Sequence, residues 1–293
     1  MNFTGHNILL DNGQMTMGTK EVLMANSVMW RAIEKTFNLF IPLTREERSK
    51  LRVVDLGCLE GGYTVEFARM GFDTLGIEAR EENIQKCNYV KSNLSFSNLN
   101  FVHDDVRNLS KYGKFDITFC SGVLYHLNDP IQFLKTINTC TTKLLLLNTH
   151  FTRERDLRYD LGALSKYLIA RILKRIKILK YQENYRLSKI TQNEGYSGRW
   201  FKEWKENEKK DKIEKMLWAS YNNNKSFWLC KKDLTRALHN IGFDSVFEQF
   251  DFTGDIVPEN FIEFYDRSMF VAIKHIYRQT GVTDVQLLSK SSY

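Results

Sequence analysis

The stretch Arg52–Gly62, with sequence RVVDLGCLEGG, decides the fold of this chain. It is a short apolar run that ends in glycine-rich sequence, a pattern typical of a buried strand in an open parallel sheet. We expect a strand at Leu51–Leu56, a tight turn, and a helix at Tyr63–Met70. Turns after such strands often bind nucleotides, because glycine lets the backbone approach a ligand closely. Taken alone, the pattern is equally compatible with a strand that binds nothing.

The sequence beyond this stretch continues as alternating strand and helix patterns. We expect further strands at Asp73–Glu78, Leu99–His103, Phe115–Cys120 and Lys143–Asn148. The predicted helices are Thr19–Leu43, Arg80–Asn93 and Pro130–Cys140. The last part of the chain is predicted to form strand Ser226–Leu229, helix Lys231–Ile241, and strands Asp244–Phe250 and Ser268–Lys274. This alternation predicts an α/β fold with a parallel, doubly wound sheet.

The alternation breaks between residues 151 and 221. This region has helical patterns, many charges and three tryptophans, and we find no strand pattern in it. We therefore predict an inserted helical cap at 151–221. The remaining chain divides into an N-terminal flap and helix at 1–50 and a core formed by 51–150 and 222–293.

The composition is that of a globular protein. With 293 residues and 43% hydrophobic content, the chain can bury the core of one large domain with additions. We find neither a long apolar run nor a secretory signal, so we expect a cytoplasmic protein without a membrane span. The cysteines are odd in number and form no CxxC pair, which predicts free thiols and no metal site. They are Cys58, Cys87, Cys120, Cys140 and Cys230.

The positive charge is concentrated in one segment. Residues Arg153–Lys189 carry eleven Lys or Arg and four Asp or Glu, so their net charge equals the +7 of the whole chain. Three interpretations remain open: the solvated basic face of a cap helix, a site for an anionic acceptor, and a surface for RNA or a membrane. Nearby aromatic residues, among them Trp200, suit stacking on sugars or bases, or packing of the cap.

Four features between Leu51 and Lys274 resemble the class I S-adenosylmethionine-dependent methyltransferases. They are the glycine-rich motif Val53–Gly62, the acid Glu78 about 20 residues later, the run His103-Asp104-Asp105-Val106, and FDITFCSGVLYHL at Phe115–Leu127. The resemblance implies S-adenosylmethionine as cofactor. It also implies a Rossmann-like seven-stranded sheet whose two final strands form an antiparallel end.

The resemblance also implies which residues contact the cofactor. They are Asp55, Gly57, Cys58, Gly61, Glu78, Ala79, Asp104, Asp105, Val106 and Ser121. The glycines would let the backbone approach the methionine portion. Glu78 offers two acceptor oxygens to the two ribose hydroxyls, and Asp105 can accept a hydrogen bond from the adenine amine. Each acid taken singly is equally explained as a solvated strand end, a turn residue or a helix cap.

One position departs from the family pattern. Leu59 occupies the place of the middle glycine in the first motif, and Gly62 adds a glycine after it. A side chain there would crowd a ligand, so we expect Leu59 to point away from the cofactor.

Two histidines follow strands whose carboxyl ends should face the site. Methyl transfer to a hydroxyl needs a base, and histidine titrates near neutral pH. His126 follows the fourth strand and His150 the fifth, which makes both candidate catalytic bases. Their structural alternatives are a histidine packed beside a helix start and a capping residue. Tyr125 is a candidate acceptor contact.

The N-terminal run His6–Gly18 resembles a segment, HxIxLxxGxxTxG, that precedes the core in some bacterial methyltransferases, including the tRNA wobble-uridine carboxymethyltransferases. The Trp-Tyr before the histidine and the proline after the threonine are absent here. A plain hairpin around Asn12-Gly13 is the structural alternative. The functional interpretation is a flap over the cofactor or acceptor, with His6 among the substrate contacts.

These observations predict O-methylation of a small or medium acceptor, such as a sugar, a nucleotide-linked or carrier-bound intermediate, or a secondary metabolite. Two alternatives are a tRNA- or RNA-modifying methyltransferase and a non-catalytic cofactor-binding partner protein.

Overall fold

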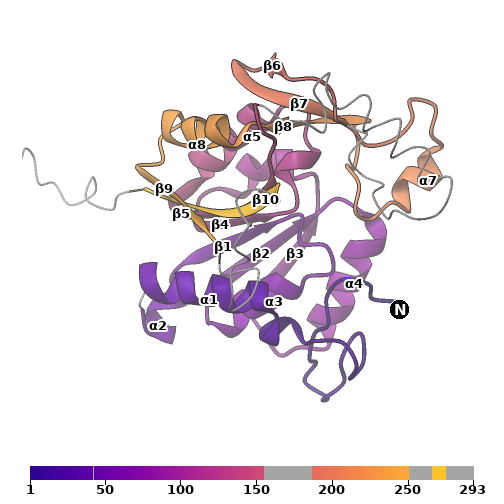
Figure 1. The fold of residues 1–293 in the computed structure, drawn as a ribbon. Coiled ribbons are helices and arrows are strands. Elements are labelled where there is room, and N and C mark those ends of the chain that lie inside the picture. The colour runs from indigo at the N-terminus through magenta and orange to yellow at the C-terminus, as the bar shows by residue number, and fades with distance from the viewer. Residues whose placement is uncertain (42, 155–186, 251–265, 275–293) are drawn as a thin grey trace, which may run out of the picture.

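The computed structural model describes residues 1–41, 43–154, 187–250 and 266–274. A seven-stranded sheet lies at the centre of the fold, in the order β3-β2-β1-β4-β5-β10-β9 (Figure 1). Its strands are β1 (Arg52–Leu56), β2 (Asp73–Glu78), β3 (Leu99–His103), β4 (Phe115–Ser121), β5 (Thr141–His150), β9 (Ser245–Gln249) and β10 (Arg267–Ile273). The predicted Rossmann-like seven-stranded sheet is confirmed.

The direction of the last strand places new residues at the site. β1 to β5 pair in parallel, whereas β10 runs antiparallel to both β5 and β9. β10 therefore begins at the edge where the parallel strands end, and its first residue, Arg267, pairs with His150 at the end of β5. This edge is where open α/β sheets bind ligands.

Helices cover both faces of the sheet (Figure 1). The described helices are α1 (Val28–Phe40), α2 (Arg45–Arg48), α3 (Gly62–Arg69), α4 (Glu81–Ser92), α5 (Pro130–Cys140), α7 (Lys210–Glu214) and α8 (Lys231–Asn240), with short 3-10 turns η1 (Met24–Asn26), η2 (Val106–Tyr112) and η3 (Leu124–His126). α1 and α3 pack on one face, through Trp30, Phe37 and Phe67. α5 and α8 pack on the other, where Leu134 and Leu238 join the core.

The first helix is shorter than the predicted Thr19–Leu43. It begins only at Val28, because Ser27 caps it: the Ser27 hydroxyl oxygen accepts a hydrogen bond from the backbone N–H of Trp30 at 3.1 Å. The residues before it form the turn η1 and an N-terminal segment that runs across the site.

The helical structure predicted for 151–221 is wrong for the described residues 187–221, which contain strands; that the region forms a cap stays a prediction. β6 (Thr191–Asn193), β7 (Tyr196–Lys202) and β8 (Lys225–Leu229) form a separate antiparallel sheet, so the strand predicted at Ser226–Leu229 lies outside the main sheet. Glu194 and Gly195 both have positive φ angles and make the tight hairpin between β6 and β7. The basic helix predicted within 155–186 lies outside the described residues.

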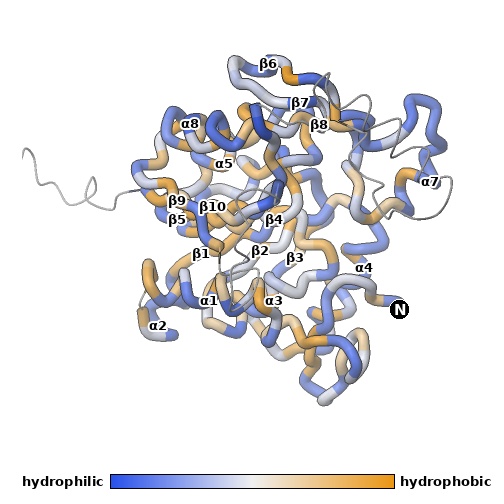
Figure 2. Tube along the Cα trace, in the orientation of Figure 1, coloured by the Kyte–Doolittle hydropathy of each residue, from blue (hydrophilic) through white to orange (hydrophobic). Residues whose placement is uncertain are grey.

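Hydrophobic residues concentrate along the central strands (Figure 2). The run Leu144–Leu147 in β5 is almost completely buried, as its purely aliphatic sequence predicts. Within the described ranges, no helix is both long enough and apolar enough to cross a membrane.

Candidate cofactor and acceptor site

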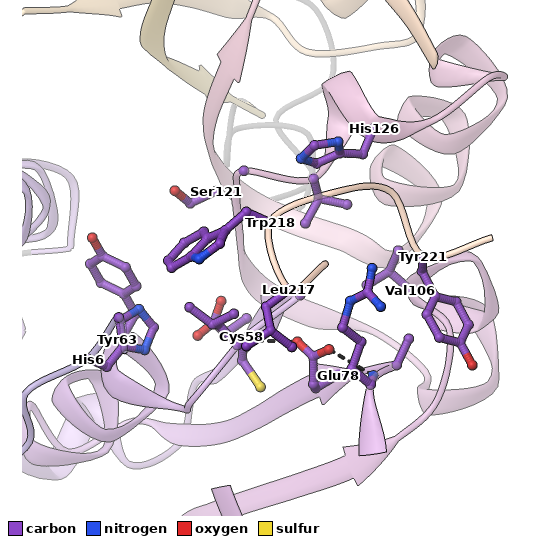
Figure 3. A pocket seen from close by; sticks show the side chains of 18 of the residues that line it. His6, Cys58, Tyr63, Glu78, Val106, Ser121, His126, Leu217, Trp218 and Tyr221 are labelled. Atoms are coloured by element: carbon purple, nitrogen blue, oxygen red, sulfur yellow. Dashed lines mark hydrogen bonds between the residues drawn. The ribbon is translucent and has the colours of Figure 1, made fainter. Parts of the chain in front are cut away.

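A cavity of about 600 Å³ lies at the carboxyl ends of β1, β2 and β4 (Figure 3). The N-terminal segment borders it on one side and residues 217–222 on another. Most of the site residues predicted from the sequence line this cavity. They are His6, Asp55, Gly57, Cys58, Glu78, Ala79, Asp105, Val106, Ser121, Tyr125 and His126.

Two of the predicted cofactor residues have structural roles beside the cavity. Gly61 has a positive φ of 84° at the start of α3, and a Cβ there would come within 2.7 Å of the Phe101 ring. The Asp104 carboxylate accepts hydrogen bonds from the Asn108 amide at 2.6 Å and the Tyr112 hydroxyl at 2.8 Å. Neither residue belongs to the cavity lining.

The predicted base His150 and the predicted acceptor contact Trp200 also lie outside the lining. The His150 ring stacks on Trp228 at 4.7 Å between centroids, and its Nδ1 lies 3.1 Å from a carboxylate oxygen of Asp266. Trp200 packs edge-on against Phe227 at 5.0 Å, as part of the core. Both side chains are engaged in packing, because Trp228 and Phe227 of β8 lie against them.

Two buried carboxylates line the cavity. Glu78 Oε2 accepts the backbone N–H of Leu59, and Oε1 accepts that of Arg80, both at 2.9 Å. Asp55 Oδ2 accepts the Thr64 hydroxyl at 2.7 Å. Burial raises the pKa of Glu78 above its ordinary value and raises the pKa of Asp55 to about 7. These acids can accept hydrogen bonds from hydroxyl groups or pair with an ammonium group.

The glycine-rich loop brings backbone close to the cavity. Gly57 has a φ of 68°, and a Cβ there would come within 2.5 Å of Val123. Leu59 also has a positive φ, of 52°, which is costly for a residue with a side chain. Its Cδ2 lies 2.7 Å from where a Cβ of Gly5 would stand, so Leu59 packs beneath the N-terminal segment while lining the cavity. That it points away from the cofactor stays a prediction.

Glu60 anchors the N-terminal segment to this loop. Its fully buried carboxylate accepts the backbone N–H groups of Thr4, Gly5 and His6, each at 2.9 Å. The Lys86 ammonium donates to it at 3.1 Å. Burial alone would raise the pKa of Glu60, but these hydrogen bonds outweigh it and hold the pKa below its ordinary value. Sequence analysis missed Glu60, because the motif treats its position as variable.

Arg80 fixes a second cover, which we call the strap (residues 213–223). The buried Arg80 guanidinium donates to four backbone carbonyls at 3.0 to 3.1 Å. These carbonyls belong to Ile213, Glu214, Ala219 and Ser220. Arg107 adds a hydrogen bond to the Asn222 side chain at 2.8 Å. One arginine, two residues beyond Glu78, thereby holds the strap over the cavity.

His126 lies at the cavity with a carboxylate behind it. Its Nδ1 is 2.8 Å from Glu203 Oε1, and Glu203 also accepts the Ser226 hydroxyl at 2.7 Å and the backbone N–H of Ser220 at 3.2 Å. With a proton on Nδ1 donated to Glu203, the lone pair of the ring is on Nε2. Sequence analysis missed Glu203, which lies 77 residues from His126 in a region without a motif.

A cationic group completes this side of the cavity. Arg267 Nε donates to Asn148 Oδ1 at 2.6 Å, and its guanidinium carbon lies 5.7 Å from the centre of the Tyr125 ring. Burial raises the pKa of the Tyr125 phenol, so it stays a neutral hydrogen-bonding group. The sequence signal for Arg267 is its place at the start of an antiparallel strand, which puts it at the edge where β5 ends.

The lining fits S-adenosylmethionine. Glu78 and Asp105, which are predicted to contact ribose and adenine, line the cavity together with Asp55 and Gly57, which are predicted at the methionine end. A Cβ at Gly57 would meet Val123, so this turn takes only glycine without rearrangement. When bound, the cofactor would supply an electrophilic methyl group.

Comparison with known proteins agrees with this arrangement. Residues 47–216 match the family model described as "Methyltransferase domain". Curated relatives named tRNA U34 carboxymethyltransferase include one from Campylobacter hominis, 33% identical over 112 residues, and one from Campylobacter concisus, 36% identical over 90 residues. These matches span 38% and 30% of each chain, so the whole relatives are only partly represented.

The crystal structure of the N-terminal domain of EvdMO1 in the presence of SAH and D-fucose has a similar fold. It is 21% identical, with a TM-score of 0.58, covering 92% of this chain and 91% of that one. A second structure of that domain, with SAH bound, gives 19% identity and a TM-score of 0.57. Since the family model spans more than half of the chain and the sheet agrees with the fold of that neighbour, the chain belongs to the methyltransferase domain family.

Proposed function

We propose that the chain methylates a hydroxyl group of a small or medium acceptor, with His126 as the general base. The observation that carries this proposal is the pair formed by His126 and Glu203, 2.8 Å apart, at the cavity wall. His126 was one of two candidate bases, and the other, His150, is stacked on Trp228 outside the lining.

The pair suits proton transfer from a hydroxyl. Glu203 accepts the Nδ1 proton, which leaves Nε2 of His126 free to take the acceptor proton as the methyl group is transferred. The Glu203 side chain is only 2% exposed, so its charge would stabilise the imidazolium that forms in a poorly solvated environment. The hydrogen bond also fixes the orientation of the ring.

The enclosure of the cavity favours a small acceptor over a long nucleic acid. The strap and the N-terminal segment border a volume of about 600 Å³, within the range typical of small-molecule sites. Arg267 and Tyr125 offer a cation and a ring face, which suit a sugar or an anionic acceptor. The presence of D-fucose with the structurally similar EvdMO1 domain is in keeping with a sugar.

The test uses transfer of a tritiated methyl group from S-adenosylmethionine into a cell extract that is then separated into small molecules and RNA. With the labelled fraction as substrate, we expect His126→Gln to lower kcat by about 10² to 10⁴ while cofactor affinity stays within twofold. Glu203→Gln should lower kcat less, and His239→Gln, on α8, serves as the matched control. Undiminished transfer by His126→Gln would reject His126 as the base, and label confined to RNA would reject a small acceptor.

A second candidate is modification of tRNA at U34. The curated relatives carry that name, the run His6–Gly18 resembles their N-terminal segment, and the basic segment 153–189 suits a polyanion. This candidate expects tRNA affinity that falls steeply with salt, because phosphate contacts release counterions. Mass spectrometry of nucleosides from tRNA incubated with the protein would detect the modified U34.

A further inference from the structure

His6 is held at the cavity by two hydrogen bonds that fix both its backbone and its ring. Its backbone N–H donates to Glu60 Oε2 at 2.9 Å. Its Nδ1 accepts the backbone N–H of Gly62, also at 2.9 Å, at the start of α3. An atom that accepts an N–H carries no proton of its own, so in the neutral ring the proton is on Nε2.

That Nε2–H group has no hydrogen-bond partner within the described part of the chain. His6 lines the cavity, and Figure 3 shows its ring beside Tyr63 at one end of the site. The two rings meet edge to face, with centroids 5.3 Å apart, which prevents the imidazole from turning. Burial lowers the pKa of His6 to about 4, although Glu60 opposes this, so the ring stays neutral near pH 7.

We propose that His6 Nε2–H donates a hydrogen bond to the carboxylate of the methionine portion of S-adenosylmethionine. The ring contacts Gly62, directly after the glycine loop that is predicted to contact the methionine portion. That portion carries a sulfonium, an ammonium and a carboxylate. Only the carboxylate can accept a hydrogen bond from a group that solely donates.

The acids of the cavity complement this assignment. Asp55 and Glu78 suit the ammonium and the hydroxyl groups of the cofactor, but neither can bind a carboxylate while ionised. Arg267 pairs with the end of β5 and donates to Asn148, and His126 lies in η3 after β4, whereas His6 contacts the Gly62 backbone directly. His6 is therefore the donor best placed for the anionic end of the cofactor. The proposal depends on the cofactor and not on the identity of the acceptor.

The experiment compares two ligands by calorimetry: S-adenosylmethionine and its decarboxylated form, which keeps the ammonium and the sulfonium. Two variants separate the two ring nitrogens. His6→Asn places an amide oxygen near Nδ1, so it can still accept the Gly62 N–H, but it is too short to replace Nε2. His6→Gln places an amide N–H near Nε2 and gives up the bond to Gly62.

We expect His6→Asn to weaken binding of S-adenosylmethionine about tenfold or more and to change binding of the decarboxylated form less than twofold. His6→Gln should recover part of the lost affinity for the carboxylate. His239→Asn, on α8, is the matched control. Equal losses of affinity for both ligands would show that His6 acts only through the fold of the N-terminal segment. Unchanged affinity for both ligands would show that His6 does not contact the cofactor. Both outcomes overturn the proposal. Thermal unfolding of each variant checks that it is folded.

Discussion

Asp55 couples cofactor binding to pH, because burial raises its pKa to about 7. Below that pH the folded protein holds Asp55 protonated, and only the ionised form attracts an ammonium group. We therefore expect affinity for S-adenosylmethionine to rise from pH 5.5 to 7, by up to about tenfold per pH unit, the limit for a single proton. Calorimetry across this range measures the slope.

Two variants separate the contributions of the two buried carboxylates of the cavity. Asp55→Asn should flatten the pH dependence of cofactor affinity. Burial also raises the pKa of Glu78, so Glu78→Gln should remove only the part of the pH dependence that Glu78 contributes. The pKa of His6, about 4, lies below the range and adds little to it. A slope that persists unchanged in Asp55→Asn would contradict the role given to Asp55.

Substitutions of Leu59 test whether the backbone of the glycine-rich loop is strained. Its positive φ costs a residue with a Cβ about 1 kcal/mol or more, which glycine avoids. Leu59→Gly and Leu59→Ala both remove the contact with Gly5, so their difference isolates the backbone. We expect the glycine variant to be more stable than the alanine variant by about 1 kcal/mol in urea unfolding. Equal stabilities would show that the loop is not strained.

At the scale of elements, the strap depends on the geometry of one guanidinium. Arg80 donates to four carbonyls at once, and a lysine ammonium has three donors and no planar fork. We expect Arg80→Lys to leave at least one buried carbonyl unpaired, weaken S-adenosylmethionine binding about tenfold, and speed proteolysis within 213–223. Arg236→Lys is the matched control, because the exposed Arg236 side chain pairs with Asp233, outside the strap in sequence. Proteolysis as slow as in the control would contradict the clamp.

The elements that the sequence predicts well are those specified by local patterns. The bounds of β2, β3 and α5 match the predicted ones, because continuous apolar runs or a helix-starting proline mark them. β6 and β7 were missed, since their signal is a turn at Glu194-Gly195 that needs positive φ at a glutamate. The separate pairing of β8 depends on β7 and is not encoded within β8 itself.

The residues of the site also divide into those that a local sequence pattern predicts and those that it does not. Asp55 and Glu78 are predictable, because each stands at the end of a strand in a motif of fixed spacing. Each of the three missed residues has a distant partner: Glu60 binds His6, Glu203 binds His126 and Arg80 binds Ser220, which lie 54, 77 and 140 residues away. No local pattern reveals these pairings. Their roles arise only once the chain is folded and buried polar groups need partners.

At the scale of the whole molecule, the two covers of the cavity meet. The Trp218 ring, in the strap, would lie 3.1 Å from a Cβ at Gly5, and Leu59 packs beneath the same point. Glu60 holds the N-terminal segment and Arg80 holds the strap, so each cover has its own anchor. A ligand between them contacts both covers as well as the sheet.

This arrangement predicts that the cofactor orders both covers together. S-adenosylmethionine at 100 times its dissociation constant adds about 2.7 kcal/mol to the stability of the bound state. We expect hydrogen exchange to slow in residues 4–6 and in the strap over the same concentration range. Glu60→Gln should speed exchange at 4–6, because the three N–H groups lose a charged acceptor, while Lys86 keeps its pairing with Glu82.

In the Glu60→Gln variant without ligand, the strap should keep most of its protection from hydrogen exchange, since Arg80 is unchanged. On adding the cofactor, the strap of this variant should gain less protection than the strap of the unmodified protein. The reciprocal variant Arg80→Lys should free the strap and leave 4–6 protected by Glu60. If either variant instead released both covers equally without ligand, the two would form one cooperative unit through Trp218 and Gly5, and the separate anchoring would be wrong. Covers that have separate anchors and both contact the ligand are expected of a site that opens to exchange its cofactor.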